Sequence, residues 1–356
     1  MSIYSDEKVL NFPEQLAKLK NGIQPNPVYI HWVISDWCNQ NCSFCAYRMP
    51  GYESNQLFFV LENGEMNNNP RRQISLEKAL ETIQCFSDMK VKAILLTGGG
   101  EPTTHPHFRR IVEEIRAAGI KLGLNTNLVT SAKNVEILKE FEWVRVSIDS
   151  YDENSYTDVR RVSPTHWNTL IKNVQLIPKS REFVLGAGFV ITKDNFQGLH
   201  QGVSQIKDWG FDNVRLSTTF SPEKEHYYDG IEEAVQSEID RTLGLASSDF
   251  KIFNQFKLRF GDLGLGAPDY DFCGIMHFVT YVAADLNVYT CCTQAYNKRG
   301  LIGSFQDRSF QELWDSHQKK NFMSTFKASG CSWCQFNKKN RVVNTVLNPR
   351  LHSEFI

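Results

Sequence analysis

The chain has 356 residues, of which 41% are hydrophobic and 22% are charged, so it is long enough for one large α/β domain and a smaller one. A net charge of −1 and a pI near 6.8 argue against broad electrostatic binding to nucleic acid or to an anionic membrane surface. No apolar run reaches membrane-spanning length, and residues 1–27 mix charges instead of forming the apolar core of a signal peptide. We therefore expect a cytoplasmic protein that does not enter a membrane.

The hydrophobic pattern predicts strands that alternate with helices. A short helix is expected over residues 13–20, because Pro13 suits a first helical turn and prolines at 25 and 27 prevent its continuation. Strands are expected over residues 28–35, 91–96, 121–125, 144–148, 183–192 and 213–217, and helices over 75–89, 106–118, 132–141, 164–177 and 195–209. Such alternation predicts a parallel sheet, and six strands are fewer than the eight of a closed barrel. Residues 51–72 interrupt the first strand-helix unit. We expect them to form either a small hairpin or lid, or an ordinary surface loop.

Nine cysteines gather near the two ends of the chain. In a reducing compartment thiols usually serve metals or catalysis rather than disulfides. Three belong to an N-terminal group, five lie near the C-terminus, and Cys85 sits on a predicted helix among apolar residues, where we expect a core role. The distribution predicts two metal sites.

Cys38, Cys42 and Cys45 are separated by three and then two residues, directly after the first predicted strand. A tetrahedral structural zinc needs four ligands, and no fourth Cys or His follows nearby. A cubane iron-sulfur cluster held by three thiolates leaves one iron open to a substrate or cofactor. Three unrelated buried cysteines are the alternative, since free Cys is often a small core hydrophobe.

This spacing, with Phe44 before the last cysteine, resembles the signature of the radical S-adenosylmethionine (SAM) superfamily. The resemblance implies an α/β fold, namely a partial (β/α)6 TIM-like barrel with the cofactor at the carboxyl ends of the strands. It also implies that SAM chelates the open iron and that one electron from a [4Fe-4S] cluster cleaves it to a 5′-deoxyadenosyl radical.

Further motifs stand where predicted strands end. Gly98-Gly99-Gly100-Glu101-Pro102 would alone indicate only a turn, but after the cysteines it resembles the family's GGEP motif, which implies that Gly99, Gly100 and Glu101 bind the SAM amino group. The same resemblance implies cofactor contacts for Phe44, Asn127, Ser147 and Arg160, with Val190–Thr192 and Arg215 in the cofactor neighbourhood. Asn127 is followed by Leu128 where the family has Gly, and Arg160 could instead be a surface charge.

Beyond residue 220 the alternation stops. A helix over 232–245 and a Gly-rich stretch at 261–266 precede Cys273, two short strands end at Cys291-Cys292, and a helix over 310–326 precedes Cys331 and Cys334. Cys273, Cys291, Cys331 and Cys334 suffice for a second cubane, although four cysteines hold zinc equally well. The arrangement resembles the twitch subdomain, a shortened SPASM domain, which implies an auxiliary [4Fe-4S] cluster. We favour Cys291 as the ligand because it follows the strand, while Cys292 is an alternative ligand, a structural residue or a hydrogen-atom donor.

These motifs divide the chain into five segments. They are a lead-in at 1–27, the radical SAM barrel at 28–220, a connecting helix and Gly-rich linker at 221–270, the auxiliary-cluster region at 271–340 and a tail at 341–356. The resemblance implies a radical SAM oxidoreductase that abstracts a substrate hydrogen and resolves the radical with the auxiliary cluster. An external one-electron donor of the flavodoxin or ferredoxin type would be its partner.

Residues 1–27 are too short for a winged-helix leader-binding domain, which favours a small biosynthetic metabolite as substrate and dehydrogenase-like chemistry. The alternative enzyme is a peptide-modifying maturase or epimerase, with Cys292 as the hydrogen-atom donor in the epimerase. A non-enzyme alternative is an iron-sulfur electron carrier or a zinc-stabilised binding module.

Overall fold

The computed structural model describes residues 5–48 and 71–348 and shows an α/β fold built on one ten-stranded sheet. Its strand order is β10-β9-β8-β1-β2-β3-β4-β5-β6-β7. The strands are β1 (Tyr29–Trp32), β2 (Ala93–Leu96), β3 (Lys121–Thr126), β4 (Trp143–Ser147), β5 (Val184–Ile191), β6 (Asn213–Thr218), β7 (Lys251–Asn254), β8 (Val279–Val282), β9 (Asn287–Tyr289) and β10 (Leu301–Ser304). The predicted fold class, a TIM-like partial barrel with a small C-terminal region, is confirmed.

The six predicted strands are all present as β1 to β6 and pair in parallel in chain order. Two further parallel strands extend this run. β7 pairs with β6, and β8 pairs with β1 in the register Tyr29↔Val279. The expectation that the alternation of strands and helices stops beyond residue 220 is therefore wrong, because β7 lies within residues 221–270. β7 is only four residues long and incompletely buried, so its sequence lacks the apolar run that marked the other strands.

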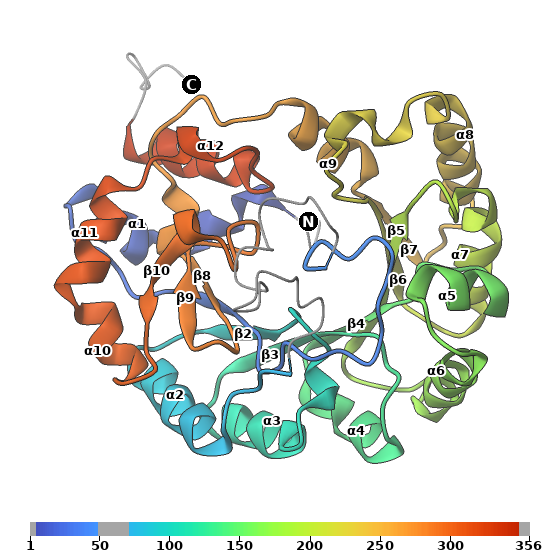
Figure 1. The fold of residues 1–356 in the computed structure, drawn as a ribbon, viewed down its shortest axis with the longest axis horizontal. Coiled ribbons are helices and arrows are strands. Elements are labelled where there is room, and N and C mark those ends of the chain that lie inside the picture. Colours follow the sequence, from blue (N-terminus) through green and yellow to red (C-terminus); the bar gives the residue numbers. More distant parts are fainter. Residues whose placement is uncertain (1–4, 49–70, 349–356) are drawn as a thin grey trace, which may run out of the picture.

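Helices lie along the outer side of the curved sheet, and Figure 1 shows α2 to α7 following one another around it, with α10, α11 and α12 grouped on the side of β8 to β10. The helices are α1 (Pro13–Lys20), α2 (Leu76–Asp88), α3 (Phe108–Ala117), α4 (Ala132–Glu136), α5 (Glu153–Arg160), α6 (Pro164–Leu176), α7 (Leu199–Asp208), α8 (Glu232–Leu243), α9 (Phe256–Gly264), α10 (Phe310–Asp315), α11 (His317–Thr325) and α12 (Asn337–Leu347). None of the described helices is both long and apolar enough to cross a membrane.

Alternate residues of the strands face opposite sides of the sheet. One set, which includes Trp32, Leu96, Leu124, Val146 and Leu216, is fully buried in the main hydrophobic core under the helices. The other set faces the interior of the barrel and is rich in polar residues, among them His31, Asn125, Arg145, Ser147 and Arg215. The barrel interior is therefore a polar space rather than a packed apolar core.

Three local expectations need correction. The Gly-rich stretch at 261–266 belongs largely to α9, because the packing of Phe256 and Leu263 outweighs the low helix propensity of glycine. The single helix expected over 310–326 is divided at Ser316, which caps α11 by accepting a hydrogen bond from the backbone of Lys319. Helix α12 crosses residue 340, where we expected a tail to begin. The proposed hairpin or lid at 51–72 lies outside the described residues but for its last two.

Candidate functional site

Cys38, Cys42 and Cys45 lie in the loop after β1, at the carboxyl end of the parallel sheet. The amide of Cys45 donates to the carbonyl of Cys42 at 3.1 Å, which winds the loop into a turn. The amides of Asn41 and Ser43 donate to the carbonyls of Arg160 and Val159, at 3.1 and 2.9 Å, at the end of α5. The loop is thereby fixed between β1 and α5 with its three thiols on the cofactor side expected of this fold.

Arg160 joins this loop to the end of β4. Its guanidinium donates to Cys42 Sγ and to Gln40 Oε1, both at 3.3 Å, and forms a buried ion pair with Asp149. It also lies over the ring of Phe44, 5.6 Å from the centroid. A buried guanidinium beside a thiol favours the thiolate, which is the form that binds iron. The structure thus places Arg160 in the cysteine site and not on the surface.

Burial raises the pKa of Cys38 to about 12, and the positive charge of Arg48 opposes this rise. Burial likewise raises the pKa of Cys42, with Arg160 acting in the opposite direction. Arg48 Nη1 also lies 3.9 Å from Cys45 Sγ. Three half-buried cysteines flanked by two arginines suit a group that brings its own positive charge and binds thiolates, as an iron-sulfur cluster does.

The glycine turn after β2 packs directly on this loop. A Cβ on Gly99 would lie 2.5 Å from Asp36 Oδ1 and 2.7 Å from the Tyr296 hydroxyl, and one on Gly100 would lie 2.1 Å from the carbonyl oxygen of Trp37. The amide of Glu101 donates to the same carbonyl at 3.0 Å. Glycine is therefore required here by the approach of the cysteine loop.

Glu101 is buried, and its carboxylate accepts four hydrogen bonds within the protein. The donors are the amide and hydroxyl of Thr103, the hydroxyl of Thr126 and the amide of Asn127, at 2.7 to 3.1 Å. Glu101 therefore fixes the loops after β2 and β3 to each other. Its predicted contact with the SAM amino group stays a prediction.

Asn127 reaches the cysteine loop from the end of β3. Its side-chain amide donates to Asn39 Oδ1 at 2.7 Å and lies 4.0 Å from Cys38 Sγ. Ser147 is the last residue of β4 and pairs in register with Gly188. The amide of Val190 donates to Asp149 Oδ1 at 2.5 Å, so this strand end also supports the Arg160 ion pair.

The four C-terminal cysteines converge from three segments. Cys273 precedes a short 3-10 turn, Cys291 follows β9, and Cys331 and Cys334 follow another turn before α12. Burial raises the pKa of Cys273, and the nearby thiols of Cys291, Cys334 and Cys331 raise it further. The predicted ligand set is thus brought together in space.

Cys292 has surroundings of its own, although its thiol acts electrostatically with that of Cys291. Its Sγ accepts a hydrogen bond from Gln335, and its charge acts on Tyr47, Tyr29 and Tyr281. The vicinal cysteines therefore face different surroundings, with Cys291 beside the other three thiols. Cys85 packs against the main core, as expected.

Within residues 5–48 and 71–348, no three His, Cys, Asp or Glu side chains are spaced to hold a single metal ion. A tetrahedral zinc with Zn–S of ~2.3 Å brings its sulfurs to about 3.8 Å from one another. A [4Fe-4S] cluster is larger than a single ion and spaces its cysteine sulfurs more widely, so this finding concerns a single ion and not a cluster.

Several residues that our sequence reasoning missed connect the two cysteine groups. The Tyr281 hydroxyl donates to the Tyr47 hydroxyl at 3.0 Å and lies 3.3 Å from the carbonyl of Gly98. Tyr296 donates to the buried carboxylate of Asp36, which also accepts from Arg72 Nε at 2.9 Å. The residues of this cluster come from distant segments of the chain. The one sequence signal that points to it is the position of Asp36, two residues before Cys38.

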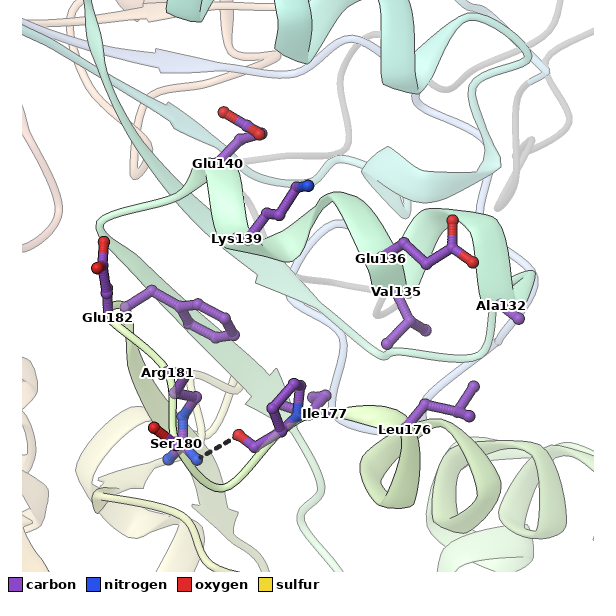
Figure 2. Close-up of a pocket in the computed structure, with 12 residues that line it drawn as sticks. Ala132, Val135, Glu136, Lys139, Glu140, Leu176, Ile177, Ser180, Arg181 and Glu182 are labelled. Carbon is purple, nitrogen blue, oxygen red and sulfur yellow. Dashed lines mark hydrogen bonds between the residues drawn. The ribbon is translucent and has the colours of Figure 1, made fainter.

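A surface pocket of about 740 Å³ lies at the amino end of β5, lined by residues of α4, the end of α6 and the loop between α6 and β5 (Figure 2). It contains none of the predicted site residues. In barrels of this type, the amino ends of the strands serve stability while the carboxyl ends carry the chemistry. The candidate site therefore remains at the cysteines.

Comparison with known proteins agrees with this geometry. The family model of the radical SAM superfamily matches residues 32–198, and that of an iron-sulfur cluster-binding domain, SPASM, matches residues 273–335. These ranges contain the first and second cysteine groups respectively.

Two curated relatives illustrate the sequence similarity. The tungsten-containing aldehyde ferredoxin oxidoreductase cofactor-modifying protein of Pyrococcus furiosus is 26% identical over 224 residues, which cover 57% of this chain and 55% of the relative. The GTP 3′,8-cyclase of Thermodesulfovibrio yellowstonii is 31% identical over 149 residues, which cover 40% and 42%. The chain spans about half the length of the curated relatives it matches.

Two solved structures share the fold. Streptococcus suis SuiB bound to S-adenosylmethionine aligns with a TM-score of 0.61 at 16% identity, covering 91% of this chain and 75% of SuiB. The enzyme anSMEcpe with bound AdoMet and a Kp18Cys peptide aligns with a TM-score of 0.58 at 16% identity, covering 84% and 83%. The chain thus contains a radical SAM domain at residues 32–198 and an iron-sulfur cluster-binding domain of the SPASM type at residues 273–335, and these two domains imply SAM and a [4Fe-4S] cluster at each of two sites as the cofactors.

Proposed function

We propose that the chain is a radical SAM oxidoreductase that removes two electrons from a small polar metabolite, one of them through the auxiliary site. SAM and the first cluster supply hydrogen-atom abstraction from an unactivated carbon, and the auxiliary cluster supplies a one-electron acceptor. The substrate then loses one hydrogen atom, one electron and one proton. Cys38, Cys42 and Cys45 would hold the first cluster, and Cys273, Cys291, Cys331 and Cys334 the second.

The observation that carries this proposal is the pairing of β1 with β8. The first cysteine group follows β1 and Cys291 follows β9, the hairpin partner of β8. Because β1 and β8 are hydrogen-bonded neighbours, the two cysteine groups are attached to adjacent parts of one sheet. The first group follows the carboxyl end of β1, whereas Cys291 lies towards the amino end of β8, since β9 runs antiparallel to β8. The hydroxyl contact between Tyr47 and Tyr281 joins them again on the interior side. This arrangement supports an electron acceptor held on the same sheet as the site of hydrogen abstraction.

A polar substrate is supported by the barrel interior. Asn125, Arg145 and Arg215 take inward positions on β3, β4 and β6, and Arg145 Nη1 lies 3.4 Å from Asn125 Oδ1. Their guanidinium and amide groups can hydrogen-bond carboxylate, hydroxyl or carbonyl groups of a bound molecule.

The proposal is tested by anaerobic reconstitution of the full chain with iron, sulfide and SAM, followed by reduction with dithionite. We expect formation of 5′-deoxyadenosine. If the first cluster is intact and no 5′-deoxyadenosine forms, the chain is an electron carrier or binding module and the proposal is wrong.

A second candidate function is peptide modification, and the observation that favours it is the fold shared with SuiB and anSMEcpe, both of which have been solved with peptides. In its epimerase form, Cys292 would return a hydrogen atom to the peptide radical. Cys292→Ala should then abolish product formation while leaving the iron content unchanged. Full product formation by this variant would exclude the epimerase.

A further inference from the structure

Tyr296 lies between the two cysteine groups. It follows the predicted ligand Cys291 by five residues, and its hydroxyl donates to the buried carboxylate of Asp36, two residues before Cys38. We propose that Tyr296 is a positioning residue that couples the two sites, because it keeps the glycine turn in the form that binds SAM when the auxiliary site holds its cluster. This inference rests on the proposed function, in which both sites serve the same turnover.

Tyr296 contacts the turn that carries the GGEP-like motif. A Cβ on Gly99 would lie 2.7 Å from the Tyr296 hydroxyl and 2.5 Å from Asp36 Oδ1, so these two side chains fill the space beside the turn. The amides of the next two residues donate to the backbone carbonyls on either side of Asp36, both at 3.0 Å. A shift of Asp36 would therefore move the turn with it.

Asp36 in turn depends on Tyr296. It is fully buried, and its carboxylate accepts from the Tyr296 hydroxyl at one oxygen and from Arg72 Nε at the other, the latter at 2.9 Å. Arg48 Nη2 donates to the backbone carbonyl of Asp36 at 3.0 Å, and the same guanidinium lies 3.9 Å from Cys45 Sγ. A buried carboxylate that loses a donor is destabilised unless it finds another. The position of Tyr296 thus affects both the glycine turn and the cysteine loop.

The backbone of Tyr296 is strained. Its φ is +58°, in the left-handed region that bulky residues rarely adopt. The side chain is fully buried, and the rings of Tyr47, Tyr281 and Tyr289 surround it at centroid distances of 6.0, 6.4 and 5.7 Å. Such a conformation persists only where its surroundings hold it, and it is common in switch regions. Tyr296 can therefore relax when one of its supports is lost.

Turns connect Tyr296 to the auxiliary ligand. The amide of Gln294 donates to the carbonyl of Cys291 at 3.1 Å, and the amide of Asn297 donates to the carbonyl of Gln294 at 3.2 Å. Cys291 Sγ lies 3.0 Å from the Thr293 hydroxyl, and the residues from Thr293 to Tyr296 are buried. Consecutive turns leave this segment little freedom, so a cluster that fixes Cys291 also restrains Tyr296.

This coupling has a consequence for the reaction. It would keep SAM from binding tightly to a chain whose auxiliary site is empty and cannot accept the electron of the substrate. A coupling between two sites typically changes affinity 5- to 150-fold, and it is reciprocal. SAM should therefore strengthen binding of the auxiliary cluster by the same factor.

The test measures the dissociation constant of SAM by equilibrium dialysis, under anaerobic conditions, with the full reconstituted chain. Four proteins form a cycle: the wild type, Tyr296→Phe, Cys331→Ala/Cys334→Ala, and the three changes combined. Tyr296→Phe keeps the ring and removes the hydroxyl that reaches Asp36. The matched control is Tyr289→Phe, made alone and with the two cysteine changes, because the Tyr289 hydroxyl donates to Asp285 at 2.8 Å instead.

We expect loss of the auxiliary ligands to weaken SAM binding at least about fivefold in the wild type and in Tyr289→Phe. In Tyr296→Phe the affinity is already reduced, and the same loss should weaken it by less than half that factor. A factor at least half as large in Tyr296→Phe, or one below fivefold in the wild type, overturns the proposal. Loss of the coupling in Tyr289→Phe also overturns it, because the effect would then belong to the hairpin as a whole.

A second measurement decides the question if Tyr296→Phe does not retain its first cluster. SAM should raise the chelator concentration that removes half of the auxiliary iron from the wild type, at least about fivefold. This iron is followed by the electron paramagnetic resonance signal that Cys331→Ala/Cys334→Ala lacks. An equal chelator concentration with and without SAM contradicts the coupling. Dithionite-driven formation of 5′-deoxyadenosine is measured separately, so that its absence would refute the proposed function while SAM binding still reports on Tyr296.

Discussion

Gly99 lies where three segments meet: the glycine turn after β2, the start of the cysteine loop, and the segment after β9 that contains Tyr296. A methyl group there would meet Asp36 Oδ1 at 2.5 Å and the Tyr296 hydroxyl at 2.7 Å, both of them buried. We predict that Gly99→Ala displaces the cysteine loop, lowers the iron content of the first site and destabilises the fold by about 1–3 kcal/mol. Iron quantification and thermal unfolding under anaerobic conditions measure these effects.

Gly261→Ala is the matched control, because a Cβ at this helical position in α9 meets nothing within 4 Å. It should keep full iron content and gain up to about 1 kcal/mol of stability from better helix propensity. If both variants keep the wild-type iron content, the packing argument for the GGEP-like turn is wrong.

Burial of His277 makes the free energy of unfolding depend on pH. It is 3% exposed, it stacks on Phe272 at 5.3 Å, and its pKa is lowered to about 4 by burial and then by the positive charge of Lys319. In the unfolded chain His277 binds a proton near pH 6.5, whereas in the folded chain it stays neutral at that pH. The stability that folding gains from neutral His277 is therefore fully present above pH 6.5 and is lost as the pH falls towards 4.

We predict that unfolding measured between pH 7.5 and pH 5 shows a smaller loss of stability in His277→Phe than in the wild type, by about 2 kcal/mol. The matched control is His317→Phe, which exchanges an exposed histidine of α11 for the same residue. The same slope in all three proteins would show that folding does not lower the pKa of His277.

At the scale of elements, α12 supports the auxiliary site from outside. Asn340 is fully buried, its Oδ1 accepts the amide of Ile275 at 2.8 Å, and its Nδ2 lies 3.6 Å from Cys334 Sγ. The Asn340 side chain thus positions both the segment that follows Cys273 and the thiol of Cys334.

We predict that Asn340→Leu leaves the Ile275 amide unsatisfied, costs about 1–3 kcal/mol and lowers the iron content of the auxiliary site alone. Thr345→Leu, an exposed change on the same helix, should affect neither quantity. Loss of dithionite-driven 5′-deoxyadenosine formation in Asn340→Leu would contradict the assignment, because the first site would then be affected.

The elements that could be predicted are those with a strong local pattern. The strands from β1 to β6 carry apolar runs between turn residues, and Pro13 and Ser75 begin α1 and α2 where expected. β7 and α9 were not predicted, because β7 is a short, half-buried strand and α9 contains two glycines. The parallel pairing of β8 with β1 is a contact between residues about 250 apart, and no periodicity within either segment reveals it.

At the functional site, too, local patterns could be predicted from the sequence and contacts between distant segments could not. Thiol spacing identified both cysteine groups, because ligand geometry imposes a local pattern. The supporting contacts of Asp36, Tyr47, Tyr281 and Tyr296 were not predictable, since tyrosine and aspartate are common residues whose meaning here comes only from their meeting across the fold.

For the whole molecule, one sheet carries two cysteine groups that are held by different supports. Arg160 and the glycine turn surround the first group, whereas α12 and the β8–β9 hairpin surround the second. Each site should therefore load its cluster without the other. We predict about eight irons per chain in the wild type and about four in both Cys38→Ala/Cys42→Ala and Cys331→Ala/Cys334→Ala.

The two variants should differ in chemistry. Cys331→Ala/Cys334→Ala should still form 5′-deoxyadenosine with SAM and dithionite, whereas Cys38→Ala/Cys42→Ala should form none. Zinc in place of the missing iron, or iron per chain unchanged by the loss of Cys331 and Cys334, would contradict an auxiliary cluster at these residues. Because β8 pairs with β1 in both variants, a loss of iron from one site with retention at the other would reflect the removed ligands and not a collapse of the shared sheet.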